Sequence, residues 1–62
     1  GEYDKALEYI RRALETDGEN AEVLDHLGDV YMKLGQPGKA QTQYQKALEL
    51  EPDNVQIRQK VQ

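Results

Sequence analysis

The stretch HLGDVYMKLG, from His26 to Gly35, decides the fold of this chain. Its apolar side chains recur every three or four residues, which is typical of one face of an amphipathic helix. Gly28 nevertheless stands near the middle of this pattern, where glycine costs about 1 kcal/mol relative to alanine. A contact made elsewhere in the fold has to offset that cost.

The same apolar spacing occurs in three further stretches, separated by residues that start or stop helices. Asn20 and Asn54 suit helix N-caps, and Gly35 suits the left-handed conformation that ends a helix. Pro37 suits a first helical turn, where its missing N–H has no partner, and Pro52 ends the third stretch. No segment alternates apolar and polar residues as a half-buried strand does, so the fold class is all-α. The apolar positions of the first two stretches span residues 3–14 and 23–34, the third stretch runs from Pro37 to Leu50, and the fourth covers residues 55–62.

The composition of the chain argues against several classes of partner. The chain has 62 residues, no cysteine and a formal net charge of −4. Nucleic acids and anionic membranes both require a basic surface, so neither is an expected partner. No apolar run approaches the roughly 20 residues of a membrane-spanning helix. We therefore expect a soluble, cytoplasmic protein with a thin core, since so short a chain buries little of its surface.

Residues of several types recur along the chain at one constant displacement. Gly1, Lys5, Ala6, Ala13, Leu14, Glu15 and Asn20 recur 34 residues later as Gly35, Lys39, Ala40, Ala47, Leu48, Glu49 and Asn54. A period near this length is typical of stacked helix-turn-helix repeats. The chain therefore contains more than one copy of a helical unit.

A further set of positions matches a known repeat pattern. These positions are Leu24, Leu27, Gly28, Tyr31, Gly35, Ala40, Tyr44, Ala47 and Pro52. With them, residues 21–54 resemble one complete tetratricopeptide repeat, and residues 1–20 resemble the second half of a preceding one. The resemblance implies a single all-α domain of antiparallel helix pairs, stacked into a right-handed superhelix. In residues 55–62, Arg58 and Gln62 replace an apolar and a small residue of the pattern, which favours a capping helix over a truncated repeat.

This arrangement gives Gly28 a structural role. Gly28 lies beside Leu27 on the packing face, and its missing side chain lets a neighbouring helix approach closely, as do Ala40 and Ala47. Burial of larger side chains, at about 25 cal/mol per Å² of apolar area, then offsets the helix penalty. We therefore expect Gly28→Ala to destabilise the fold, although alanine favours the helix.

The four tyrosines divide into core and surface residues. Tyr3, Tyr31 and Tyr44 lie on apolar stripes, so we expect them in the core. Tyr9 lies at the edge of its stripe and is expected to be half exposed. Together with Leu7 it forms the surface on which a preceding helix of a longer chain would stack.

A second face of the second expected helix carries the candidate binding residues. They are Glu22, Asp25, His26, Asp29, Met32 and Lys33. In tetratricopeptide proteins the corresponding face lines the concave groove that holds extended peptides, so the resemblance implies a protein-binding module within a longer scaffold. Asp25 and Asp29 stand where family members that grip acidic carboxyl termini have a cation and an amide, so we expect a basic or neutral peptide. Gln56, Gln59 and Lys60 would extend the groove with a single positive charge.

An alternative reading from another functional class stays open. The same face is equally consistent with an ordinary solvated surface, since glutamate and lysine are good helix formers. The chain would then be a structural spacer without a ligand of its own. It could also associate weakly with itself through its exposed repeat ends.

The residue types give no support to catalysis or to metal binding. The chain has neither serine nor cysteine as a nucleophile, no glycine-rich phosphate loop and no His-Glu-x-x-His motif, so we do not expect an enzyme. Asp25 and Asp29 lack the enclosure that acid–base catalysis needs. His26 shares a helix face with Glu22 and Asp29, but these three fall short of a four-ligand zinc shell. We expect no metal and no cofactor.

Overall fold

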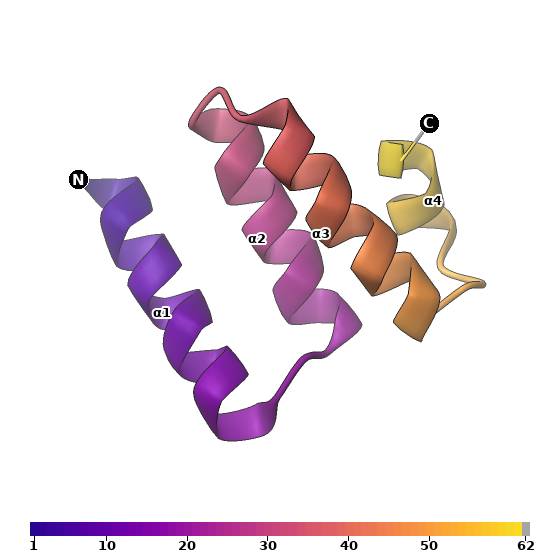
Figure 1. Cartoon of the computed structure of the whole chain (residues 1–62), viewed down its shortest axis with the longest axis horizontal. Helices are drawn as coiled ribbons and strands as arrows, with labels where there is room; N and C mark the ends of the chain where they lie inside the picture. Colours follow the sequence, from indigo (N-terminus) through magenta and orange to yellow (C-terminus); the bar gives the residue numbers. More distant parts are fainter. Residues whose placement is uncertain (62) are drawn as a thin grey trace.

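The computed structural model describes residues 1–61, which form four α-helices. They are α1 (Glu2–Asp17), α2 (Ala21–Lys33), α3 (Pro37–Leu50) and α4 (Val55–Val61). Consecutive helices run in opposite directions and follow one another across the molecule (Figure 1). No strand occurs in the described range, and the all-α prediction is confirmed.

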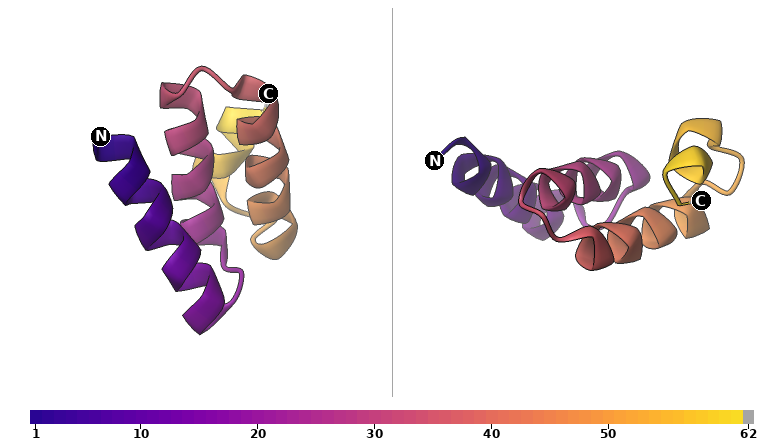
Figure 2. Two further views of the ribbon diagram at one scale, coloured as in Figure 1. Left: turned by 60° about the vertical axis from the view of Figure 1, so that its left-hand side comes forward. Right: turned by 90° about the horizontal axis from the view of Figure 1, so that it is seen from above.

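The helices form a curved row and not a closed bundle. The molecule is thin, with principal extents of 32 × 27 × 15 Å. Seen from above (Figure 2, right), α3 lies below α2 and α4, which share the other side of the row. α2 contacts both α1 and α3, and α3 also contacts α4. Each helix therefore packs mainly against its neighbours in sequence, as expected for stacked repeats. No helix of this described range has the length and hydropathy needed to cross a membrane.

Two helices begin with the same asparagine cap. The side-chain Oδ1 of Asn20 accepts a hydrogen bond from the backbone N–H of Val23 at 2.8 Å. Asn54 repeats this contact at the start of α4, where its Oδ1 accepts from the N–H of Ile57 at 3.1 Å. Each bond satisfies an N–H that has no partner inside its helix. The internal repeat therefore extends to the hydrogen bonds that start α2 and α4.

The glycine and proline signals also act as the sequence predicts. Gly35 follows the end of α2 with a φ of 74°, a backbone conformation that favours glycine. Pro37 is the first residue of α3, and that helix ends at Leu50, before Pro52. These residues confirm the predicted boundaries of the central hairpin.

The core lies among α2, α3 and α4. Ala40 and Ala47 are completely buried, and their small side chains allow the neighbouring helices to approach. The buried cluster consists of Ala21, Leu24, Ala40, Tyr44, Ala47 and Ile57, with Leu14, Tyr31, Leu48 and Val61 partly buried against it. Most of this apolar cluster therefore belongs to three helices, with α1 at its margin.

Gly28 of α2 lies against the ring of Tyr44 on α3. A Cβ added to Gly28 would lie 2.7 Å from Cδ1 and 2.8 Å from Cζ of that ring. Tyr44 is only 3% exposed, so its ring has little room to move away. The predicted close approach at Gly28 is confirmed, and an aromatic ring takes the space that a side chain would fill.

α1 is less enclosed than its apolar stripe predicts. Among the described residues of α1, only Ile10 is buried. Tyr3 is 40% exposed, so the prediction that it belongs to the core is wrong. Tyr9 is 74% exposed, more than the half expected. The physical reason is the same for both, because α1 packs mainly against one helix, α2.

α4 joins the core through one face and presents polar residues on another. Ile57 is 2% exposed, whereas Val55 is 61% exposed. Arg58 is exposed, and its guanidinium donates a 2.6 Å hydrogen bond to the carbonyl oxygen of Pro52. These contacts support the interpretation of this segment as a capping helix, which stays a prediction. Gln62, also named in that interpretation, lies outside the described residues.

Candidate functional site

The predicted binding residues lie on a side of α2 other than the one that carries its buried apolar residues. Leu24, Leu27 and Gly28 are buried on the packing side. Glu22, His26, Met32 and Lys33 are exposed, and Asp25 and Asp29 are partly buried. Successive members of this set are three or four residues apart, so they share one face of the helix. We call these six residues, Glu22, Asp25, His26, Asp29, Met32 and Lys33, the α2 face.

Lys60 of α4 pairs with both aspartates of the α2 face. Its Nζ lies 2.8 Å from Oδ1 of Asp25, and 3.2 Å and 3.3 Å from the two carboxylate oxygens of Asp29. The three side chains are only partly exposed, at 34% for Lys60, 22% for Asp25 and 47% for Asp29. The sequence places Lys60 in an extension of the predicted groove but does not show that it neutralises these carboxylates. The two aspartates are thus already engaged within the chain.

Tyr44 connects this charged cluster to the core. Its hydroxyl donates a 2.6 Å hydrogen bond to Oδ1 of Asp29, and the Nζ of Lys60 lies 5.5 Å from the centre of its ring. Sequence reasoning identified Tyr44 as a core residue but missed its polar contact. The tyrosine hydroxyl is the sequence signal that could have predicted this contact, because a buried tyrosine usually has a hydrogen-bond partner. This contact holds Asp29 at the junction of three helices.

Both titratable groups beside Asp29 hold their protons tightly. Burial raises the pKa of Tyr44, and the hydrogen bond to Asp29 adds to this effect. Burial opposes the protonated form of Lys60, but the hydrogen bonds and charges of Asp25 and Asp29 outweigh it and raise the pKa of Lys60. At neutral pH the cluster therefore contains a neutral phenol and a positively charged ammonium group.

His26, Glu22 and Asp29 do not converge on a common point. His26 Nε2 lies 3.9 Å from Oε1 of Glu22, and both side chains are mostly exposed. Asp29 instead contacts Lys60 and Tyr44. Among residues 1–61, no group of three or more histidine, cysteine or acidic side chains is placed to hold a metal ion. These three residues share a helix face without forming a ligand shell.

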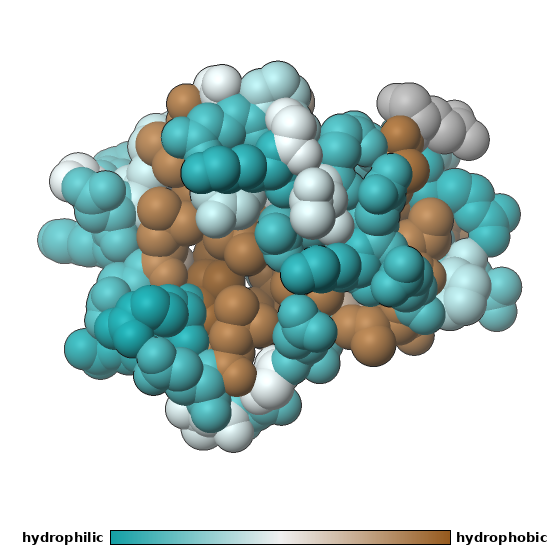
Figure 3. All heavy atoms as spheres, in the orientation of Figure 1, coloured by the Kyte–Doolittle hydropathy of each residue, from teal (hydrophilic) through white to brown (hydrophobic). Residues whose placement is uncertain are grey.

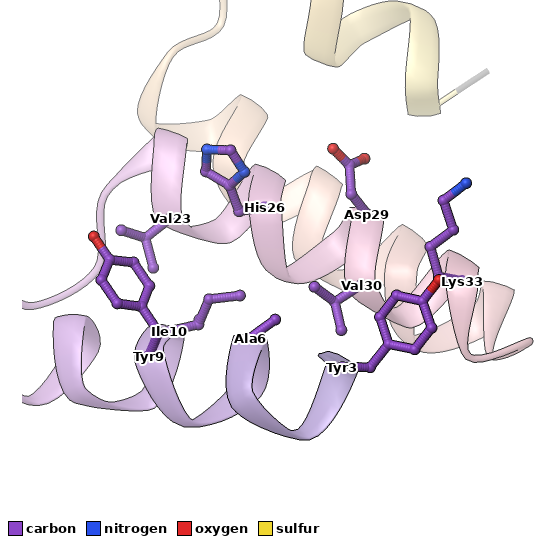
Figure 4. A pocket seen from close by; sticks show the side chains of 9 residues that line it. All are labelled: Tyr3, Ala6, Tyr9, Ile10, Val23, His26, Asp29, Val30 and Lys33. Atoms are coloured by element: carbon purple, nitrogen blue, oxygen red, sulfur yellow. The ribbon is translucent and has the colours of Figure 1, made fainter. Parts of the chain in front are cut away.

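A groove lies between α1 and α2, next to the α2 face. Its volume is about 330 Å³. On the face of the molecule drawn in Figure 3, apolar residues are also exposed beside α1. In the close-up of Figure 4, side chains from the two helices point toward one another across the groove. The lining residues are Tyr3, Ala6, Tyr9 and Ile10 of α1 and Val23, His26, Asp29, Val30 and Lys33 of α2. We call this feature the α1–α2 groove.

The α1–α2 groove brings together residues that sequence reasoning treated separately. His26, Asp29 and Lys33 belong to both the α2 face and the groove. Tyr9 lines the groove, whereas Leu7, predicted to share its stacking surface, is not among the lining residues of the described chain. Leu7 is instead partly buried elsewhere on α1. Tyr9 and Leu7 therefore do not line the same groove, and the stacking of a preceding helix on α1 stays a prediction.

Comparison with known proteins agrees with the helical architecture. A tetratricopeptide repeat family model matches residues 21–54, and a second tetratricopeptide repeat model matches residues 1–20. The chain is 37% identical over 54 residues to the human protein named Superkiller complex protein 3. That alignment covers 87% of this chain and 4% of the relative, so the chain spans only a small part of the relative's length. No solved structure matches the chain. From the matched repeats and the stacked helical hairpins, the chain belongs to the tetratricopeptide repeat family.

Proposed function

We propose that the chain binds a protein or peptide segment on the α2 face, as part of a longer scaffold and without catalysing a reaction. Tetratricopeptide repeats mediate protein–protein interactions. One observation carries the choice of surface: Glu22, His26, Met32 and Lys33 are exposed, while the opposite side of α2 is buried in the core. A ligand can therefore contact this face without disturbing the packing of the helices.

The charges around the α2 face favour a neutral or basic segment over an acidic one. The α2 face and Lys60 together carry three carboxylates, from Glu22, Asp25 and Asp29, and two ammonium groups, from Lys33 and Lys60. Their formal charges sum to one net negative charge. Lys60 already compensates the two aspartates, so the remaining field at this face is weak. Shape and apolar contact with Met32, which is 50% exposed, then contribute alongside charge.

The test is a titration of the chain with short lysine-containing peptides and with their glutamine-containing counterparts, followed by backbone amide shifts. We expect saturable shifts at residues of the α2 face, and a salt dependence only for the lysine-containing peptides. Met32→Ala should weaken binding. Leu50→Ala, which removes an equally exposed apolar side chain from α3, is the matched control and should not.

A different pattern of results favours the spacer or self-association alternative. In that case no amide of the α2 face moves with any peptide. The elution volume of the chain would then depend on its own concentration, or the chain would remain a monomer without a ligand. Equal effects of Met32→Ala and Leu50→Ala would also contradict the proposed surface.

A further inference from the structure

Lys60 reaches the α2 face from another helix. α2 and α4 lie on the same side of α3 (Figure 2, right), and the long side chain of Lys60 extends from α4 to α2. Three carboxylate oxygens lie within 3.3 Å of its Nζ, one from Asp25 and two from Asp29. An ammonium group has three N–H donors, so these two aspartates can accept from all of them. Lys60 therefore uses its charge within the chain and offers little of it to a ligand.

Contacts with α3 hold Lys60 in this position. Gln41 donates a 3.0 Å hydrogen bond from its side-chain Nε2 to the backbone carbonyl oxygen of Lys60. The Nζ of Lys60 also lies 5.5 Å from the centre of the Tyr44 ring, which attracts a cation. The Lys60 side chain is only 34% exposed, so its ion pairs are screened less than those on an open surface. The pairing with the aspartates is thus built into the packing of α3 and α4.

The two aspartates are positioned independently of Lys60. Asp25 and Asp29 are four residues apart on α2, so they lie one helical turn apart on the same face. Asp29 also accepts a 2.6 Å hydrogen bond from the hydroxyl of Tyr44, whose ring is buried. The aspartate side chains are 22% and 47% exposed, so solvent and a ligand can reach them. Loss of the Lys60 charge would therefore leave two ordered carboxylates without their internal cation.

We infer that Lys60 is a specificity-determining residue of the α2 face, where its ammonium group occupies the two aspartates and limits the preference for basic peptides. This inference rests on the proposed function, because it concerns a ligand bound at the same face. In the parent chain, a cationic side chain of the peptide meets paired carboxylates and is repelled by the ammonium group between them. Lys60→Gln removes both the competing partner and the repulsion.

The test uses the lysine-containing peptides and their glutamine-containing counterparts with the parent chain and with Lys60→Gln. The quantity compared is the ratio of the two dissociation constants for each protein. Lys60→Gln should raise the preference for lysine at least about fivefold, through tighter binding of the lysine-containing peptide. The affinity for the glutamine-containing peptide should stay nearly constant. High salt should reduce the gain, because it arises from charge.

Lys46→Gln is the matched control for net charge. It removes the same charge from an exposed position of α3, and it should leave the preference for lysine unchanged. Lys60→Met is a second uncharged variant that keeps an apolar side chain of similar length. It should reproduce the gain of Lys60→Gln, so the test does not depend on the folding of one variant. Circular dichroism confirms that each protein remains helical.

Asp25→Asn combined with Lys60→Gln tests the origin of the gain. The double variant should lose most of the increased preference for lysine, because one of the two carboxylates that receive the peptide's ammonium group is gone. A general loosening of the fold by Lys60→Gln would not depend on Asp25 in this way. An undiminished gain in the double variant would contradict the assigned role of the aspartate pair.

The possible failures separate this inference from the proposed function. Equal preferences for the parent and Lys60→Gln, with both peptides bound, would overturn the inference and leave the proposed function intact. An equal gain for Lys46→Gln would also overturn it, since net charge alone would then explain the result. Absence of binding to the parent and to every variant would overturn both. Tight binding of a glutamate-containing peptide that depends on Lys60 would show that Lys60 serves the ligand directly, which contradicts the inference.

Discussion

The two ends of this molecule repeat one sequence pattern but differ in packing. Ala40 and Ile57 are covered by α2, while Ala6 and Val23, their equivalents 34 residues earlier, remain partly exposed. The alanines are identical and the other pair are both β-branched, so side-chain chemistry does not explain the difference. The presence of a third helix against α3 and α4 explains it. Burial at these positions depends on the neighbouring helix and not on the residue type.

The largest expected effect compares Ile57 with Val23. Ile57→Ala should lower the free energy of unfolding by about 2 to 3 kcal/mol, because it opens a cavity beneath a covered side chain. Val23→Ala should cost about 1 kcal/mol or less, since its position is partly open. Urea unfolding followed by circular dichroism measures both. Equal losses would show that the side chains of Val23 and Ile57 are equally well covered.

Gly28→Ala should give the next largest effect, a loss of about 1 to 2 kcal/mol. Alanine improves helix propensity, but its Cβ would overlap the buried ring of Tyr44, and overpacking outweighs that gain. Gly38→Ala is the control, because a Cβ there meets no atom within 4 Å. It should be neutral or slightly stabilising in the same unfolding experiment. Stabilisation by both variants would refute the close-approach explanation.

Tyr44→Phe tests the hydrogen bond between the Tyr44 hydroxyl and Asp29. Its removal should lower the free energy of unfolding by about 1 kcal/mol at neutral pH. The raised pKa of Tyr44 also means that the unfolded chain releases this proton from about pH 10.0 upward, while the folded chain retains it. The free energy of unfolding therefore falls as the pH rises above about 10. The raised pKa of Lys60 acts in the same direction above its ordinary value of 10.5.

Unfolding of the parent and of Tyr44→Phe is measured from about pH 8, below the ordinary pKa of tyrosine, to about pH 12, where the unfolded chain has released this proton. The variant should lose less stability over the alkaline part of the range. Parallel curves for the two proteins would mean that Tyr44 does not contribute to the alkaline loss.

The smallest expected effect compares Lys60 with its equivalent, His26. Lys60→Gln should cost about 0.5 to 1 kcal/mol, because the ion pairs with Asp25 and Asp29 are partly exposed and screened by solvent. The loss should shrink at high salt. His26→Gln should change stability very little, since the carboxylate beside His26 in the described residues is that of Glu22, 3.9 Å away and exposed. A larger loss for His26→Gln would contradict the difference between the two ends.

Local sequence signals determined most of the helical framework. Asn20, Asn54, Gly35 and Pro37 act at the helix ends as predicted, because each satisfies or removes a backbone group within a few residues of itself. Gly28 indicated a close approach of two helices, since its cost within the helix required a compensating contact. Such signals can be read from the chain because their physical causes are local.

Tertiary structure alone decided which members of each pattern are covered and which charges are paired. Tyr3 and Tyr44 both lie on apolar stripes, yet only Tyr44 has helices packed around it. Lys60 and Asp25 are 35 residues apart, and no spacing rule of a single helix relates them. The periodicity of a helix specifies which side chains share a face, but the partner of that face depends on how separate helices stack. For that reason the sequence predicted the α2 face, while the α1–α2 groove and the engaged aspartates emerged only from the folded molecule.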